Sequence, residues 1–192
     1  MNEVKITEQF PFQFKKVDRP DGVHLSDIIK LLTKELFPKD FYDEAKLGAA
    51  EYARVRLQWE LGLVWEDVLS AGLGNRYAPR WEPRQTKEGI WLSPDGIEIV
   101  QNDGVNVVHE YKLTSLKSDK TPKAVIRWMW QVKSYCLHFG AMEAVFHVLY
   151  TRGNYQPPFT PQYEVYKETF TPQELIENWQ MLVNYAKSKG ML

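Results

Sequence analysis

Three side chains in the middle of the chain could together hold a divalent metal ion beside a phosphate group. Asp95 follows Pro94 in a stretch of alternating apolar and polar residues, and Glu110 and Lys112 lie two apart in the next such stretch. Side chains alternate along a strand, so Glu110 and Lys112 should project from one face, and antiparallel pairing can bring Asp95 beside them. Carboxylate oxygens suit Mg²⁺, and the lysine can orient or activate a water and neutralise charge developing on a phosphate.

The same short pattern occurs a second time near the N-terminus, where its context is different. Pro20-Asp21-Gly22 repeats the Pro-Asp-Gly sequence, and Glu44 and Lys46 repeat the acid-x-Lys spacing. A helix is predicted between these two parts, and Glu44 and Lys46 should begin another helix, where residues two apart diverge. Only the copy around Asp95 is therefore expected to lie on paired strands.

A further carboxylate upstream could join this site. Glu66 follows Gly62 by four residues on an apolar stripe of a predicted helix, where an unpaired charge would be costly and a bound metal would remove the cost. Glu51 and Glu60 are alternatives for the same role.

Polar and basic side chains downstream could contact a nucleic acid. Gln131 and Tyr135 are four residues apart and share one face of a predicted helix. A local basic stretch lies where a phosphate backbone would pass, although a solvated helix start explains it nearly as well. It comprises Lys117, Lys120, Lys123, Arg127 and Lys133.

Hydrophobic periodicity predicts the helices before the site. Ser26 should cap a short helix that runs to Leu36, and a long helix should run over 44–71 and end at Gly72 and Gly74. The long helix is apolar on two faces, which predicts that it is sandwiched inside the protein. One face carries Leu57, Leu61, Val64 and Val68, and the other carries Tyr52, Val55, Trp59 and Leu63, followed by Glu66.

The remaining elements alternate between strands and helices, which predicts an α/β fold with a central mixed β-sheet flanked by helices. Strands are expected over 90–100 (interrupted at 93–96), 105–113, 144–150 and 163–170, with a hairpin turn at 102–104. Helices are expected from Thr121 to Phe139 and after a capping box at Thr171 and Glu174. We expect one domain over 1–192, with an extended arm over 1–22, a core over 44–150 and a C-terminal strand and helix over 163–190.

These motifs, taken in order, resemble the PD-(D/E)xK nuclease superfamily, above all the RecB-type and lambda-exonuclease-type nucleases of phages. The resemblance covers roughly 44–150 and implies a restriction-endonuclease-like core. It rests on Gly62…Glu66, Pro94-Asp95, Glu110-Tyr111-Lys112 and Gln131-Val132-Lys133-Ser134-Tyr135.

The resemblance also implies a role for each matched residue. Glu66, Asp95 and Glu110 would bind one or two Mg²⁺ ions (Mn²⁺ can substitute), and the backbone carbonyl of Tyr111 would complete the shell. Lys112 would serve the attacking water. Gln131 and Tyr135 would help to hold DNA.

The activity implied is that of a Mg²⁺-dependent deoxyribonuclease, with an exonuclease of phage or bacterial recombination and repair favoured. The alternatives are an endonuclease on the same core and a non-catalytic DNA-binding or assembly protein. DNA is the expected partner; a recombination protein and a second copy of the chain are further candidates. The expected location is the cytoplasm of a bacterium or a phage-infected cell.

Composition and two departures from the family limit this interpretation. The 192 residues carry a net charge of −1, so no global basic field indicates nucleic acid. Cys136 is the single cysteine, which excludes the iron–sulfur members with their four cysteines. The RecB subgroup often has a histidine where this helix offers Glu66, so the upstream ligand stays open. No stretch approaches the length of a membrane span.

Overall fold

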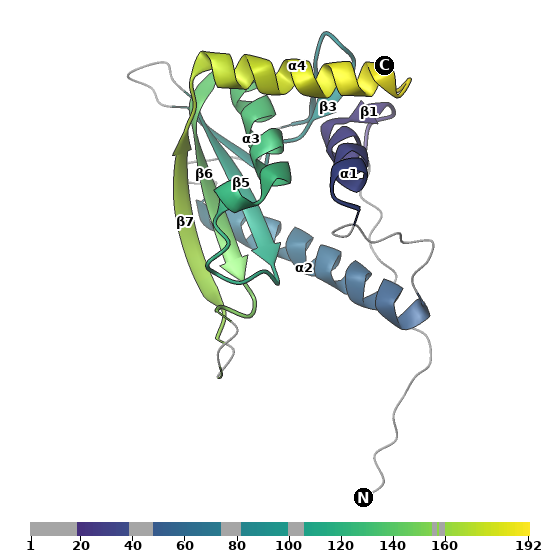
Figure 1. The fold of residues 1–192 in the computed structure, drawn as a ribbon. Coiled ribbons are helices and arrows are strands. Elements are labelled where there is room, and N and C mark those ends of the chain that lie inside the picture. The colour runs from purple at the N-terminus through teal and green to yellow at the C-terminus, as the bar shows by residue number, and fades with distance from the viewer. Residues whose placement is uncertain (1–18, 39–47, 74–81, 100–105, 155–156, 158–159) are drawn as a thin grey trace, which may run out of the picture.

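A four-stranded mixed sheet forms the centre of the protein in the computed structural model, which describes residues 19–38, 48–73, 82–99, 106–154, 157 and 160–192 (Figure 1). The strands pair in the order β4-β5-β6-β7, with β5 and β6 parallel and the two outer pairs antiparallel. Their bounds are β4 Gly96–Ile99, β5 Asn106–Thr114, β6 Ala141–Tyr150 and β7 Gln162–Thr169.

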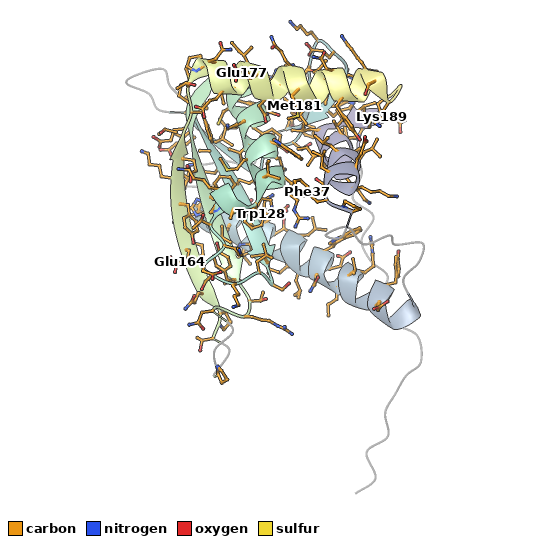
Figure 2. All side chains as sticks on the ribbon, in the orientation of Figure 1. Phe37, Trp128, Glu164, Glu177, Met181 and Lys189 are labelled. Atoms are coloured by element: carbon orange, nitrogen blue, oxygen red, sulfur yellow. The ribbon has the colours of Figure 1, made fainter. Side chains whose placement is uncertain are left out.

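One face of this sheet is covered by α3, with two further helices packed against α3. The crossover between the parallel strands β5 and β6 contains α3 (Ile126–Phe139), which packs against both strands and against α1 (Leu25–Leu36) and α4 (Pro172–Ser188). Figure 2 shows side chains filling the layer between the sheet and these helices. Alternate residues of β6 supply the sheet side of the core, and all four are fully buried: Ala144, Phe146, Val148 and Tyr150.

The fourth long helix, α2 (Ala49–Leu73), packs on β5 and passes behind the lower part of the sheet in Figure 1. The indole of Trp65 meets the Tyr163 ring of β7 edge-on, with 5.7 Å between the ring centroids. The α2 helix thus reaches across β5 toward β7. Its side chains pack against β5, the strand that carries Glu110 and Lys112.

A second, smaller sheet has no counterpart in the sequence prediction. It joins β1 (Val23–His24), β3 (Ile90–Leu92) and β2 (Arg84–Gln85) in the order β1-β3-β2. The predicted strand over 90–100 is therefore two strands in different sheets. Pro94 has no backbone N–H to donate to a ladder, so the chain leaves the small sheet after Leu92 and enters the large one at Gly96.

The ends of α1 and α3 and the start of α4 are confirmed, whereas the starts of α1 and α3 need correction. The N-cap of α1 is His24, not Ser26, because the Asp27 carboxylate accepts the backbone N–H of His24 at 3.4 Å. Thr121-Pro122 opens a 3-10 turn over Pro122–Ala124, and α3 begins only at Ile126. The capping box of α4 is confirmed, since Thr171 and Glu174 cap each other's backbone N–H groups.

The expectation that the long helix is sandwiched inside the protein is wrong. One predicted stripe of α2 is exposed along its length: Leu57, Leu61, Val64 and Val68 have exposed fractions between 41% and 58%. The helix packs on the sheet through one side only, and two apolar faces do not by themselves supply a second packing partner. Its bounds also differ, because it begins at Ala49 and contains Gly72; residues 44–47 and Gly74 lie outside the described residues.

The predicted fold class is confirmed. The hairpin of β4 and β5, the crossover helix α3 and the strands β6 and β7 form a mixed sheet flanked by helices. The predicted turn at 102–104 and residues 1–18 of the predicted arm lie outside the described residues. No helix within the described part of the chain is long and apolar enough to cross a membrane.

Candidate active site

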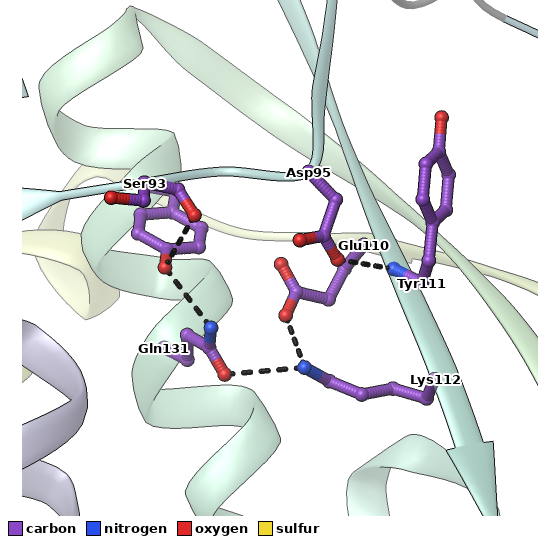
Figure 3. Close-up of polar contacts among 7 residues, drawn as sticks. Ser93, Asp95, Glu110, Tyr111, Lys112 and Gln131 are labelled. Carbon is purple, nitrogen blue, oxygen red and sulfur yellow. Dashed lines mark hydrogen bonds and ion pairs between the residues drawn. The ribbon is translucent and has the colours of Figure 1, made fainter. Parts of the chain in front are cut away.

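The kink between β3 and β4 brings Asp95 against the middle of β5. Gly96 pairs with His109, so the residue before it lies level with Glu110, and Asp95 Oδ2 accepts the backbone N–H of Tyr111 at 2.7 Å. Glu110 and Lys112 project together from β5 on the side facing α3 (Figure 3). The structure therefore places the three predicted side chains at one point of the fold.

A continuous chain of hydrogen bonds connects β5 to α3 and back to the kink. The Lys112 ammonium donates to Glu110 Oε1 and, at 3.3 Å, to Gln131 Oε1 (Figure 3). The Gln131 amide donates to the Tyr135 hydroxyl at 3.0 Å, which in turn donates to the carbonyl of Ser93 at 3.1 Å. Gln131 and Tyr135 thus position Lys112 and anchor the chain just before Asp95.

Glu110 is a strongly perturbed carboxyl group within this cluster. Its side chain is 0% exposed, and its second carboxyl oxygen, Oε2, has no hydrogen-bond partner among the described residues. Burial, with the charge of Asp95 acting in the same direction, raises the pKa of Glu110 to about 8. A buried acceptor without a donor costs free energy, which a bound cation would remove.

Lys112 stays protonated despite its partial burial. Burial alone would lower the pKa of the ammonium, but the charges of Glu110 and Asp95 outweigh it, and the pKa of Lys112 is raised. The side chain is therefore a positive donor, and it cannot be a metal ligand.

The α2 helix brings Glu66 to the edge of this cluster. Glu66 lines a cavity of about 510 Å³ together with Tyr111 and Lys112, and its charge acts on both Glu110 and Lys112. Glu60 lines the same cavity but forms an ion pair with Arg56 at 3.6 Å. Glu51 is exposed in the first turn of α2 and is not among the residues lining this cavity. Of the three candidate acids, Glu66 has the geometry closest to the expectation, because its charge acts on Glu110 and Lys112.

The donor set fits a hard cation only in part. Asp95 and Glu110 are adjacent carboxylates, and Glu110 offers an unpartnered oxygen, which suits Mg²⁺ or Mn²⁺. Within the described ranges, however, no group of three His, Cys, Asp or Glu side chains is arranged to hold a metal ion. Glu66 would thus need to approach the pair for a third carboxylate to share the ion.

The residues of the predicted basic stretch have different surroundings in the structure. Arg127 lines a smaller cavity of about 230 Å³ with Lys112 and Gln131. Lys123 and Lys133 instead pair with acids of β7 and α4, at 2.9 Å from Glu168 and 3.6 Å from Glu174. Lys117 and Lys120 are exposed before the 3-10 turn.

Two notable features were not predicted from the sequence. Lys30 of α1 lines the smaller cavity, and Arg56 of α2 lines the larger one, so each adds a cation beside Lys112. Both lie on helices remote in sequence from β5, and no local motif marks them. On the opposite face of β5, His109 is buried and hydrogen-bonded to His147 at 3.0 Å.

The second copy of the short pattern, around Asp21, lies in a different part of the fold. Asp21 precedes β1 of the small sheet, and its backbone carbonyl accepts the indole N–H of Trp91 at 3.0 Å. Glu44 and Lys46, the other half of that motif, lie outside the described residues.

Comparisons with known proteins bear on the fold alone. No protein-family model matches the chain, and no curated protein matches its sequence. By structure the chain is similar to SSO0001, with a TM-score of 0.56 and 17% identity over 92% of this chain and 78% of that one. It is also similar to a phage related exonuclease from Haemophilus somnus 129PT, with a TM-score of 0.48 and 14% identity over 85% of this chain and 78% of that one. At these identities neither protein assigns an activity.

Proposed function

We propose that this chain is a divalent-metal-dependent nuclease that hydrolyses phosphodiester bonds in DNA. One observation carries the proposal: the buried Glu110 carboxylate, with one unpartnered oxygen, lies between Asp95 and the ammonium of Lys112. Burying these charges together is costly, and a purely structural role would be served better by apolar side chains. Strongly perturbed groups gathered beside a cavity are typical of catalytic sites.

Asp95 and Glu110 would hold the ion, and Glu66 is the candidate for a third carboxylate. A bound Mg²⁺ or Mn²⁺ would supply a water of lowered pKa and a positive charge beside the phosphate. In hydrolysis, the oxygen of a water forms a bond to phosphorus while the bond to the leaving ester oxygen breaks. The attacking water gives up a proton in this step, and the leaving ester oxygen takes one up.

Lys112 would act as a donor in this reaction and not as the base. Its raised pKa keeps the ammonium charged, so it can orient the attacking water or stabilise the extra negative charge on the phosphate. Gln131 would hold the ammonium in place through its side-chain oxygen. Arg127 and Lys30, which line the neighbouring cavity, would attract the DNA backbone.

The exonuclease activity favoured by the sequence resemblance and an endonuclease activity use the same site, so substrate topology must separate them. The direct test incubates the protein with linear double-stranded, closed circular and single-stranded DNA, with Mg²⁺ or with excess EDTA, and resolves the products by size. We expect cleavage with Mg²⁺ or Mn²⁺ and none with Ca²⁺ or EDTA. An exonuclease leaves closed circles intact. Full activity in EDTA, or none on any DNA with Mg²⁺, contradicts the proposal.

A further inference from the structure

The larger cavity contains a feature that the catalytic cluster does not use. The cavity is lined by Tyr111, Lys112 and Leu113 of β5 and by residues of α2 that include Trp59. Trp59 is 45% exposed, although a tryptophan gains more from burial than most side chains. An exposed indole beside a candidate active site therefore needs an explanation.

Two cations from two different helices flank this indole. The guanidinium of Arg56 lies 5.5 Å from the centroid of the Trp59 ring, and the ammonium of Lys30 lies 5.9 Å from it. Arg56 is on α2 one turn before Trp59, whereas Lys30 comes from α1. An aromatic face accompanied by positive charge is how proteins bind single-stranded nucleic acid: bases stack on the ring while cations follow the backbone.

The charged residues that line the two cavities indicate which part of a nucleotide each cavity suits. The two acids that line the larger cavity, Glu60 and Glu66, offset the charges of Arg56 and Lys112, so that cavity has no net positive charge for a phosphate and favours an uncharged base. The smaller cavity carries Lys30 and Arg127 and shares Lys112 with the larger one. It also contains the buried hydroxyl of Thr33, which has no hydrogen-bond partner among the described residues. The smaller cavity therefore suits the phosphates of the same strand.

We infer that Trp59 is a stacking platform for an unstacked base, and that the site takes single-stranded DNA or the frayed end of a duplex. This inference rests on the proposed function and specifies its substrate. A base inside a duplex has both faces covered by its neighbours, so it reaches Trp59 only after it leaves the stack. Lys112, which lies at the junction of the two cavities, then faces the phosphate next to that base.

The test separates stacking from attraction of the backbone. Binding is measured by fluorescence anisotropy in EDTA. One labelled probe is an oligothymidylate of 12 nucleotides, and the other is a strand of 12 abasic tetrahydrofuran units. The two probes have the same phosphates, and only the first has bases. We expect the protein to bind the strand with bases about 5- to 150-fold more tightly, the range for one stacked base.

Three variants identify the residue responsible. Trp59→Ala should lose most of the preference for bases, and Trp59→Tyr should keep most of it because tyrosine also stacks. Tyr52→Ala is the matched control: Tyr52 is a similarly exposed aromatic residue on α2, at 43%, and is not among the residues lining the cavity. It should keep the full preference.

An equal affinity of the unmodified protein for the two strands overturns the inference, as does an unchanged preference in Trp59→Ala. Because binding is measured without a metal, the result does not depend on cleavage. A protein that cleaves no DNA but loses its base preference in Trp59→Ala retains the stacking site and refutes the nuclease proposal. A protein that cleaves DNA but binds the two strands equally well supports the nuclease proposal and refutes the stacking site.

Discussion

The protonation state of Glu110 should control metal binding. Burial and the charge of Asp95 raise the pKa of Glu110 to about 8, so at lower pH a cation must displace a proton from this carboxyl. Mg²⁺ affinity should therefore rise, by up to about tenfold per pH unit, until the pH reaches about 8, and then level off. Calorimetric titration across this range measures it. Glu110→Gln should bind Mg²⁺ weakly at every pH, and a pH-independent affinity in the unmodified protein would refute the assignment.

Lys112 should contribute to turnover more than to binding. Its charged ammonium lies beside Glu110 and Gln131, where it can stabilise charge that develops only during the reaction. Lys112→Ala should lower the single-turnover cleavage rate by orders of magnitude, with much smaller changes in DNA affinity. Lys112→Arg should rescue poorly, because a planar guanidinium does not replace a compact ammonium.

The control for this variant is Lys187→Ala, which removes an exposed lysine from the last turn of α4. Its cleavage rate should equal that of the unmodified protein. Cleavage by Lys112→Ala within a few-fold of the unmodified rate would show that β5 is not the active-site strand.

Site residues could be predicted from the sequence where a single strand positions them. They could not be predicted where the packing of two distant elements positions them. Glu110 and Lys112 share a face by strand geometry alone, and the Pro94 kink marked Asp95. The contact of Lys30 with Trp59 joins two helices whose relative placement no local pattern encodes. The ion pair of Arg56 with Glu60 also became visible only in the folded chain.

Gly62 offers a test of the α2 helix and its cavity. A methyl group added at this position would meet no atom within 4 Å, and glycine inside a helix is less stable than alanine by about 1 kcal/mol. Gly62→Ala should thus raise the free energy of unfolding by about 0.5–1 kcal/mol in urea titrations. Because Gly62 lines the larger cavity, the same change should raise KM for DNA if a nucleotide enters there.

Gly72→Ala is the matched control on the same helix. Gly72 also has free space around it and is not among the residues lining the cavity. This variant should change stability, by less because the position is close to the helix end, and should leave KM unchanged. A destabilised Gly62→Ala protein would contradict the described packing of α2.

Among the elements, those with a clear period or cap were predicted best. Alternation predicted β5, and the capping box predicted α4, since both signals are local. The burial of α2 was predicted wrongly because amphipathicity shows which faces are apolar and not which of them find a partner. The strands β1 and β2 have two residues each, too few for any periodicity, so the small sheet was missed.

The stability of the whole molecule should fall in mild acid because of a buried histidine pair. Burial, followed by the nearby His109, lowers the pKa of His147 to about 4. Between pH 6.5 and about 4 the unfolded chain binds a proton at His147 that the folded protein does not. The folded state is therefore destabilised as the pH falls, by roughly 3 kcal/mol over the full interval.

Urea unfolding of the unmodified protein and of His147→Gln across this interval measures the contribution. Glutamine can still donate a hydrogen bond but does not titrate, so the variant should lose less stability on acidification. Equal slopes of stability against pH in the two proteins would show that His147 is not held neutral by the fold.

The account as a whole claims that one of two identical motifs forms the active site because the fold places it on paired strands. Asp95 and Asp21 both lie in a Pro-Asp-Gly sequence, but only Asp95 meets β5. The most direct test is the Mg²⁺-dependent single-turnover cleavage of DNA by Asp95→Ala and Asp21→Ala, after circular dichroism has shown both to be folded. We predict that Asp95→Ala loses cleavage by orders of magnitude and that Asp21→Ala cleaves at the rate of the unmodified protein. Equal loss in both variants, or full activity in Asp95→Ala, would contradict the account.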